Sequence, residues 1–274
     1  MRLVLAMAIG LALPGTPGTA ADPQELGPAV MLDHSARFEV DGPTGPLVVQ
    51  VRWPATAPPP EGYGVIYAMD AGWTFGTLCD ALALQGSVQA AGPVRSTVVV
   101  GIGWPGPGLI DLDRRGPDLV EAPGGEALVR VLSDTILPRI EASLPVDPAH
   151  RMVLGHSYGG AFALRAGFAR PDLFSHVAAG SPSIWTDPAA LGAPPPGEAR
   201  PKVLVTIGAL ERPEAALAAG ERLERVARLR SRDMAGRVES LARDLRTDLV
   251  EFPGLSHGAS ATPFAATAVD FLWR

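Results

Sequence analysis

The sequence predicts an α/β protein whose core is a doubly wound, mostly parallel sheet flanked by helices. Apolar runs alternate with helical stretches along the chain, which is the pattern of strands joined by crossover helices. The runs at 64–69, 97–102 and 202–207 are mostly apolar, as are parallel strands that are buried on both faces. Residues 155–159 (GHSYG) join another apolar run to an Ala-rich stretch, so a strand, a sharp turn and a helix are expected there.

The chain before residue 155 follows this pattern element by element. Its first two apolar segments flank a turn with Gly42 and Pro43, which predicts two antiparallel strands. The expected strands are 30–40, 47–53, 64–69 and 97–102, and the expected helices are 77–90 and 126–144. Residues 103–125 contain four Pro residues and are expected to form a long loop.

The chain after this point continues the alternation to its end. The expected strands are 151–154, 176–179, 202–207 and 249–252, and the expected helices are 160–168, 213–245 and 265–272. A break near Ser231 is expected in the longest of these helices, and a loop is expected up to Pro196. With the earlier elements, these make one continuous α/β domain, which we expect at residues 22–274.

Composition and charge narrow the classes of function. The 274 residues suffice for one domain with a sizeable core, and the formal net charge of −6 argues against a nucleic-acid partner. The chain has no H-E-x-x-H motif and no Cys/His pair at ligand spacing. Gly101-x-Gly103 opens a Pro-rich loop instead of a helix. We therefore expect neither a metal nor a nucleotide cofactor.

The first residues have the pattern of an export signal. A short positive start is followed by an apolar run at 3–13, too short to cross a bilayer, and by small residues at 18–21. We expect a signal peptide at 1–21, export to the periplasm or the cell exterior, and no membrane span in the mature chain. An uncleaved or lipidated anchor is the alternative, but no Cys lies near the cleavage site. Cys79 is the only cysteine, so no internal disulfide is expected.

Gly155-His156-Ser157-Tyr158-Gly159 predicts a catalytic nucleophile. The pattern G-x-S-x-G between a strand and a helix is a nucleophile elbow, in which the serine occupies a strained turn and needs small neighbours. The flanking glycines supply these neighbours, and His156 is expected to point away from the site. A Gly-rich loop with a bystander serine is the alternative. The strand and helix on either side favour Ser157 as the nucleophile.

A serine hydroxyl needs a base to take its proton and a carboxylate to orient that base. In the chain order Ser, Asp or Glu, His, the base follows the last strand, where His257 stands. The acid is expected after the strand at 202–207, where Glu211 is the first carboxylate and Glu214 the second. Glu211 is favoured, because Glu214 suits the first turn of a helix. Asp187 is a third candidate, but it precedes the wrong strand.

Attack by the serine creates an oxyanion, which needs N–H donors already in place. One donor is expected from Tyr158, the residue after the nucleophile. The second is expected from the loop after the strand at 64–69, where Gly72 permits close approach of the backbone. Gly72 or Trp73 is therefore the expected second donor, and a simple glycine turn is the alternative.

Several motifs follow one another in an order typical of a known family. Tyr67-Ala68-Met69-Asp70-Ala71-Gly72 is similar to a Y-x-L-D-G segment, and 155–164 with 170–174 match an elbow and its helix. The remaining motifs are 124–125 with 137–141, Ser181-Pro182-Ser183-Ile184-Trp185, 208–211 and 253–257. From residue 30 to its end, the chain resembles the esterase D-like ("Putative esterase") family of α/β-hydrolases. The resemblance implies the α/β-hydrolase fold and a serine esterase that cleaves carboxylic esters.

Within that family, the chain resembles the periplasmic ferric-siderophore esterases, which cut catecholate trilactones. Such a substrate is large, aromatic and anionic, so it implies stacking surface and positive charge near the nucleophile. The side chains expected to border it are Trp73, Trp104, Arg114, Arg115 and Trp185. The chain departs from the family pattern in two places, because Ala71 separates the D and G and 113–119 only loosely matches an Arg-rich D-L-T-P stretch.

Other functions stay open at this point. A general esterase for small aryl or acyl esters needs only an apolar pocket, and an acyltransferase would use the same acyl-enzyme. A non-catalytic binding protein with this fold is a third alternative, against which the intact Ser157 and His257 argue. The Arg residues between 222 and 246 alternate with acidic residues, which indicates a solvated helix face instead of an anion site. The sequence indicates no oligomeric state.

Overall fold

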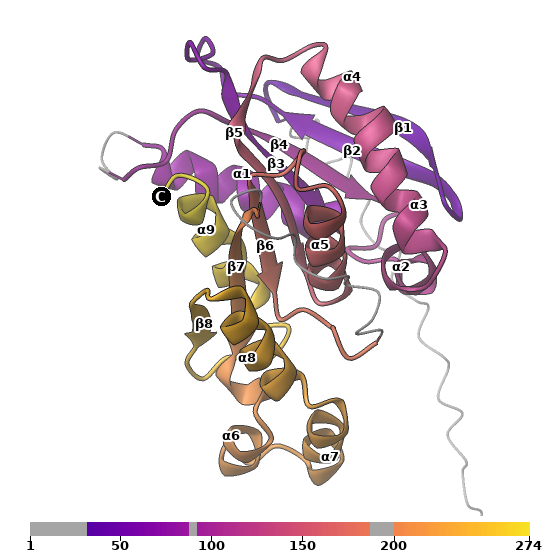
Figure 1. Ribbon diagram of the computed structural model, residues 1–274, viewed down its shortest axis with the longest axis vertical. Helices are drawn as coiled ribbons and strands as arrows, with labels where there is room; N and C mark the ends of the chain where they lie inside the picture. The colour runs from indigo at the N-terminus through magenta and orange to yellow at the C-terminus, as the bar shows by residue number, and fades with distance from the viewer. Residues whose placement is uncertain (1–31, 88–91, 187–199) are drawn as a thin grey trace, which may run out of the picture. The chain divides into compact units, whose positions relative to one another are not determined.

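The computed structural model of the chain describes residues 32–87, 92–186 and 200–274. Residues 34–274 form one compact unit, which holds the sheet and its helices (Figure 1). The expected signal peptide at 1–21 lies outside the described residues. The signal peptide and a domain beginning at residue 22 therefore stay predictions.

The sheet lies at the centre of this unit. Its strands within the described residues are β1 (Ser35–Gly42), β2 (Gly45–Arg52), β3 (Tyr63–Met69), β4 (Thr97–Gly103), β5 (Val146–His156), β6 (His176–Gly180), β7 (Lys202–Gly208) and β8 (Leu249–Phe252). Their spatial order is β1-β2-β4-β3-β5-β6-β7-β8. β2 pairs antiparallel with both β1 and β4, and every other neighbouring pair is parallel. This mostly parallel sheet with antiparallel N-terminal strands confirms the predicted fold class.

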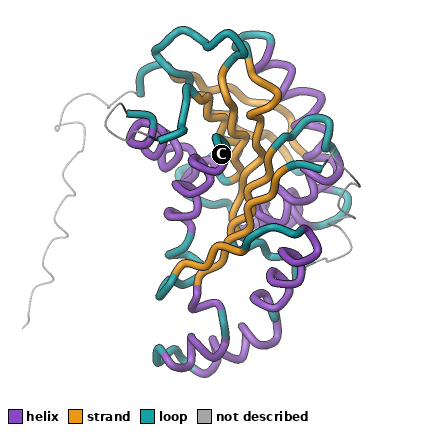
Figure 2. Tube along the Cα trace, turned by 60° about the vertical axis from the view of Figure 1, so that its left-hand side comes forward, coloured by secondary structure: helices purple, strands orange, loops and turns teal. Residues whose placement is uncertain are grey.

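Helices cover both faces of the sheet (Figure 2). They are α1 (Ala71–Gln85), α2 (Leu112–Arg115), α3 (Gly124–Val131), α4 (Leu137–Glu141), α5 (Tyr158–Ala169), α6 (Pro213–Ala218), α7 (Leu223–Arg232), α8 (Met234–Leu245) and α9 (Ala261–Phe271). Val65 and Tyr67 of β3 pack in one core layer with α3, α4, α5 and α8. Ile66 of β3 packs in the opposite layer with α1 and α9, where Cys79 is also buried. Successive residues of β3 thus enter opposite layers, which explains why its sequence is continuously apolar.

The region after β3 differs from the prediction in its helix boundaries. α1 begins at Ala71 instead of residue 77, because Asp70 adopts a left-handed conformation with φ 60° and turns the chain directly into the helix. The predicted loop at 103–125 contains α2, whose first amides donate to the side chain of Asp111. A π-helical turn, Gly116–Val120, follows α2. These two short elements bring the loop back toward the start of α1.

The predicted helix at 213–245 is divided into α6, α7 and α8. Gly220 has a φ of 79° between the first two, and Asp233 has a φ of 45° between the last two. Positive φ cannot continue a right-handed helix, so the chain changes direction at both residues. The expected break near Ser231 lies two residues before the observed one at Asp233.

The burial of His176, the first residue of β6, can be tested by measuring how the stability of the protein changes at acid pH. Burial, helped by the nearby Lys202 and His150, lowers the pKa of His176 to about 4. The unfolded chain has a histidine pKa of about 6.5, so it binds more protons than the folded chain as pH falls from 6.5 towards 4. The contribution of His176 to the free energy of unfolding is therefore fully present above about pH 6.5, and it is lost as the pH falls from 6.5 towards 4. His176→Gln is expected to lose less stability on acidification than the unmodified protein.

The measurement is the midpoint of thermal unfolding, followed by circular dichroism from neutral pH to about pH 4.5. The unmodified protein should show the steeper decline. Parallel pH profiles for the two proteins would show that His176 is not held uncharged in the folded state.

Candidate active site

Ser157 lies at the turn that joins β5 to α5. Its backbone has φ 60° and ψ −120°, a conformation that costs on the order of 1–3 kcal/mol for a residue with a side chain. The turn is tight because Gly155 and Gly159 touch: a Cβ atom on Gly155 would lie 2.1 Å from the Gly159 carbonyl oxygen. A strained serine between glycines is the geometry of a nucleophile elbow.

The loop after β6 supports this turn. The Ser183 hydroxyl lies 3.3 Å from the Ser157 hydroxyl, and the Ser183 N–H donates to the Ser157 carbonyl oxygen at 3.0 Å. The Ser157 N–H in turn donates to the Gly180 carbonyl oxygen at 2.8 Å. The sequence marks Ser183 only as part of an S-P-S-x-W motif. Its place beside Ser157 follows from the parallel pairing of β5 with β6.

Glu211 and His257 are brought together by the loops after β7 and β8. His257 Nδ1 lies 2.6 Å from Glu211 Oε2. The carboxylate of Glu211 is buried, and it also accepts hydrogen bonds from the Ser181 hydroxyl at 2.6 Å and the Gly208 N–H at 2.8 Å. Two further donors thus hold this carboxylate against one nitrogen of the imidazole. This arrangement fixes the ring and directs its other nitrogen outward.

The other two acid candidates are not found at this position. Glu214 is exposed in the first turn of α6, where its charge favours the helix dipole. Asp187 lies outside the described residues. Among the described candidates, the geometry therefore selects Glu211 as the partner of His257.

His156 lies closer to the site than its place in the motif predicts. Its ring centroid is 4.8 Å from that of His257, so the expectation that it points away is wrong. Burial, with the charges of His257 and Arg115, lowers the pKa of His156 to about 3, which keeps this ring uncharged beside His257. No hydrogen bond joins Ser157 to His257, both of which are described; the Ser157 hydroxyl faces Ser183 instead. Such bonds commonly tighten only when substrate positions the hydroxyl.

The predicted N–H donors differ in their availability. Tyr158 is the first residue of α5, so its N–H has no acceptor within the helix. The Trp73 N–H already donates to the Asp70 carbonyl oxygen at 3.1 Å, which corrects the prediction that Trp73 could hold an oxyanion. The N–H groups of Gly72 and Ala71 have no acceptor in the described parts of the chain. Ala71 was not predicted, because the early start of α1 is not visible in the sequence.

Gly72 permits a close approach of the backbone, as expected, and the group that approaches it is the loop after β4. A Cβ atom on Gly72 would lie 2.6 Å from the Leu109 carbonyl oxygen. Its missing side chain therefore lets the loop after β4 pack on the start of α1. The backbone amides of α1 are consequently held close beneath that loop.

Arg114 and Arg115 are engaged by protein groups, which corrects the expectation that they offer free positive charge. Arg115 is 8% exposed and forms two bonds to the Asp70 carboxylate, at 2.6 and 2.8 Å. Arg114 donates to the Thr44 hydroxyl in the turn between β1 and β2 and to the carbonyl oxygens of the first two residues of β2, at 2.8–2.9 Å. It also pairs with Asp118 at 3.4 Å. One arginine thus stabilises the interior and the other fixes a hairpin.

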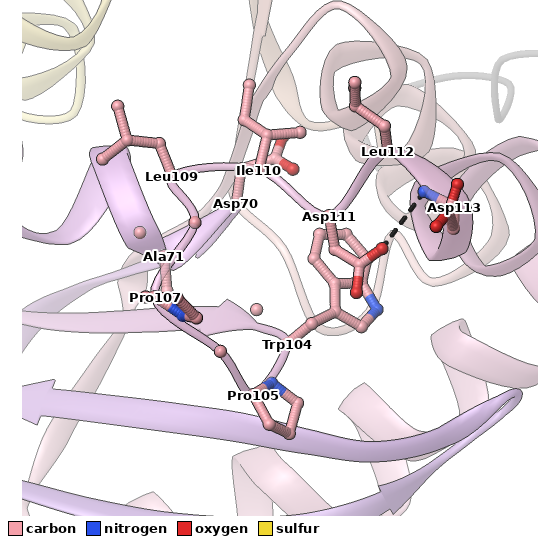
Figure 3. Close-up of a pocket in the computed structure, with 14 residues that line it drawn as sticks. Asp70, Ala71, Trp104, Pro105, Pro107, Leu109, Ile110, Asp111, Leu112 and Asp113 are labelled. Atoms are coloured by element: carbon pink, nitrogen blue, oxygen red, sulfur yellow. Dashed lines mark hydrogen bonds between the residues drawn. The ribbon is translucent and has the colours of Figure 1, made fainter. Parts of the chain in front are cut away.

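A cavity of about 460 Å³ opens between the start of α1 and the loop after β4. Figure 3 shows Trp104, Leu109, Ile110 and Asp111 among the side chains around it. Leu109 is 66% exposed, and the described residues that line the cavity include carboxylates but no Lys, Arg or His. The cavity thus offers apolar and aromatic surface next to the amides of α1.

The three predicted tryptophans occupy different environments. Trp104 lines the cavity and donates from Nε1 to Asp118 at 2.8 Å. Trp73 and Trp185 are not among the described residues that line it. The ring of Trp73 meets that of His156 edge-on at 6.2 Å, and Trp185 lies under the guanidinium of Arg232 at 4.4 Å. Of the three, Trp104 is placed to touch a ligand in this cavity.

Two further observations concern the part of the chain that the structure describes. It contains no group of three or more His, Cys, Asp or Glu side chains that could hold a metal ion. Among the same residues, no helix is both long and apolar enough to cross a bilayer.

Comparison with known proteins places this geometry in a family. The model of a family described as "Putative esterase" matches residues 43–244. The chain is 34% identical over 153 residues to the ferri-bacillibactin esterase BesA of Bacillus subtilis, covering 49% of this chain and 53% of that protein. It is 33% identical over 171 residues to the siderophore triacetylfusarinine C esterase of Aspergillus fumigatus, covering 57% and 58%. The matches thus span about half the length of these relatives.

Solved structures agree with this placement. The siderophore hydrolase EstB from Aspergillus nidulans superposes with a TM-score of 0.76 at 25% identity, covering 90% of this chain and 98% of that one. The family match extends from the turn before β2 into α8 and includes the elbow at Ser157. The chain belongs to the "Putative esterase" family and has the α/β-hydrolase fold.

Proposed function

We propose that this protein is an exported serine ester hydrolase. The observation that carries the proposal is the 2.6 Å contact between His257 and the buried Glu211, in the same site as the strained turn at Ser157. In this assignment Ser157 is the nucleophile, His257 is the general base, and Glu211 orients His257. Export rests on the pattern of residues 1–21.

The proposed reaction has two halves. In the first, Ser157 Oγ attacks the ester carbonyl carbon while His257 Nε2 takes the hydroxyl proton. The carbonyl oxygen becomes an oxyanion that accepts from the N–H groups of Tyr158 and Gly72, with the Ala71 N–H beside them. His257 then passes its proton to the leaving alcohol, and the acyl group stays on Ser157.

In the second half, His257 takes a proton from water, which attacks the acyl-enzyme and forms a second oxyanion at the same amides. The acid product leaves, and His257 returns the proton to Ser157 Oγ. An alcohol in place of water would give a new ester from the same intermediate, so acyl transfer uses the same residues.

A siderophore ester is the substrate that we propose. The relatives named as siderophore esterases support it, as does the aromatic and apolar surface of Trp104, Leu109 and Ile110 beside the α1 amides. Ser157 and His257 are not among the described residues that line this cavity, so the substrate would enter it only by extending past the α1 amides. Because the described lining includes no Lys, Arg or His, and Arg114 and Arg115 are already engaged, the cavity would suit an uncharged ester, such as an iron-free trilactone, better than an anionic ferric catecholate. The same apolar lining also suits small aryl or acyl esters, which are the second candidate.

A panel of esters tests this proposal. Ferric and iron-free catecholate trilactones, a trihydroxamate ester, feruloyl esters and short aryl esters are each incubated with the protein, and products are identified by mass spectrometry. We expect fast cleavage of the iron-free trilactone and slower cleavage of its ferric form. Hydrolysis of short aryl esters without cleavage of any siderophore would support the second candidate.

A fluorophosphonate label separates a hydrolase from a binding protein. The reagent phosphonylates an activated serine, so the unmodified chain should be labelled at Ser157 and Ser157→Ala should not. A chain that binds siderophores but resists the label and cleaves no ester would contradict the proposal.

A further inference from the structure

A buried ion pair joins the two backbone segments that supply the proposed oxyanion donors. Asp70 is 1% exposed and Arg115 is 8% exposed. Arg115 Nε and one terminal nitrogen donate to the two carboxylate oxygens of Asp70, at 2.6 and 2.8 Å. The same terminal nitrogen donates to the carbonyl oxygen of His156 at 3.2 Å. One guanidinium thus holds the end of β3 and the end of β5 together.

Each end of this contact lies next to a proposed donor. Asp70 directly precedes α1, so fixing it fixes the amides of Ala71 and Gly72. The His156 carbonyl belongs to the peptide before Ser157, and the guanidinium of Arg115 also lies 5.3 Å from the centre of the Tyr158 ring. The arginine therefore touches the residues on both sides of the nucleophile.

The backbone around the pair leaves little freedom. Asp70 has φ 60° and ψ 53°, an uncommon conformation for a residue other than glycine. A Cβ atom on Gly159 would lie 3.1 Å from Asp70 Oδ2 and 3.2 Å from Met69 Cβ, so the elbow packs directly on this turn. Two bonds from a planar guanidinium fix both the position and the orientation of the carboxylate.

We propose that Asp70 and Arg115 are positioning residues that set the spacing between the amide of Tyr158 and the amides of Gly72 and Ala71. This inference rests on the proposed ester hydrolysis. N–H donors stabilise an oxyanion only at about 2.7–3.1 Å from it, so a shift of one segment against the other weakens every transition state formed at the site. Neither residue needs to touch the substrate for this effect.

The chain offers a matched control within β5, away from the elbow. Arg151 is 7% exposed, donates to the Glu141 carboxylate at 2.8 Å and donates to the Leu173 carbonyl oxygen at 2.9 Å. It therefore has similar burial and the same kinds of partner as Arg115, but it lies in the middle of β5, five residues before His156. Its replacement should cost stability without moving the donors.

The test compares Arg115→Lys with Arg151→Lys. Lysine keeps the charge but cannot make both bonds to a carboxylate. We expect Arg115→Lys to lower kcat for a short aryl ester by about 10- to 100-fold with KM nearly unchanged, whereas Arg151→Lys should lower kcat less than about threefold. Both variants should lose thermal stability.

A second readout does not depend on the identity of the substrate. The rate of fluorophosphonate labelling at Ser157 should fall in Arg115→Lys to the same degree as kcat, because the phosphoryl oxygen uses the same donors. Asp70→Asn should resemble Arg115→Lys, and the double variant should be little worse than either single one.

The outcomes separate this inference from the proposed function. If the unmodified protein is not labelled, the assignment of Ser157 fails and the inference fails with it. Rapid labelling of the unmodified protein, together with equal losses in Arg115→Lys and Arg151→Lys, would overturn the positioning role alone. A change confined to KM would also overturn it. If Arg115→Lys does not fold, the near-isosteric Asp70→Asn decides by the same two measurements.

Discussion

Ser157→Ala is expected to lower kcat for any cleaved ester by about 10⁴-fold or more, and His257→Ala is expected to do nearly the same. Both groups act in the same proton transfer, so the double variant should be little worse than either single variant. The measurement is the initial rate of hydrolysis of a short aryl ester, with thermal unfolding to show that each variant is folded. Ser133→Ala, which changes a half-buried serine whose hydroxyl donates to the Arg130 carbonyl oxygen, is the matched control and should keep full activity.

Two results would contradict this assignment. Hydrolysis that persists in Ser157→Ala would mean that another group attacks the ester. A loss of kcat in the double variant equal to the product of the two single losses would mean that Ser157 and His257 do not act as a unit.

Glu211→Gln is expected to lower kcat by roughly 10⁴-fold, the scale seen when the acid that orients a catalytic histidine becomes an amide. Glu211 accepts from His257, Ser181 and Gly208, and an amide can offer only one oxygen to these three donors. His257 would then lose its fixed tautomer. The buried donor left without an acceptor should also cost about 1–3 kcal/mol of stability.

Glu214→Gln is the matched control for this change. Glu214 is exposed in the first turn of α6, so its loss should cost about 1 kcal/mol or less of stability and leave kcat unchanged. The reverse pattern would make Glu214 the acid. If neither variant loses activity, Ser157 and His257 act without a carboxylate.

The sequence predicts the order of the strands, and it places a candidate acid and a candidate base in the loops that follow β7 and β8. Strands β3, β4 and β7 are continuous apolar runs because both of their faces are buried. Once the elbow is located, the order of the strands leaves few positions for a base and an acid. Glu211 and His257 were expected from this order, and the structure brings them to 2.6 Å.

The surroundings of these residues could not be predicted in the same way. Arg114 and Arg115 are adjacent in the sequence, yet one holds a hairpin and the other is buried against Asp70, 45 residues away. No periodicity in a short loop shows which arginine turns inward. The hydrogen bond from the Trp73 N–H to the Asp70 carbonyl oxygen could not be predicted for a related reason. It depends on the left-handed conformation of Asp70, which starts α1 early.

The burial of Cys79 has a consequence for the proposed export of this protein, because exported proteins are exposed to oxidants. The chain contains one cysteine, so its thiol has no partner within the same molecule. Burial between the sheet and helices α1 and α9 raises the pKa of this thiol and disfavours the reactive thiolate. Protection against covalent cross-linking to a second chain is therefore a property of the packed core. This protection of the thiol is lost when α1 no longer packs against the sheet.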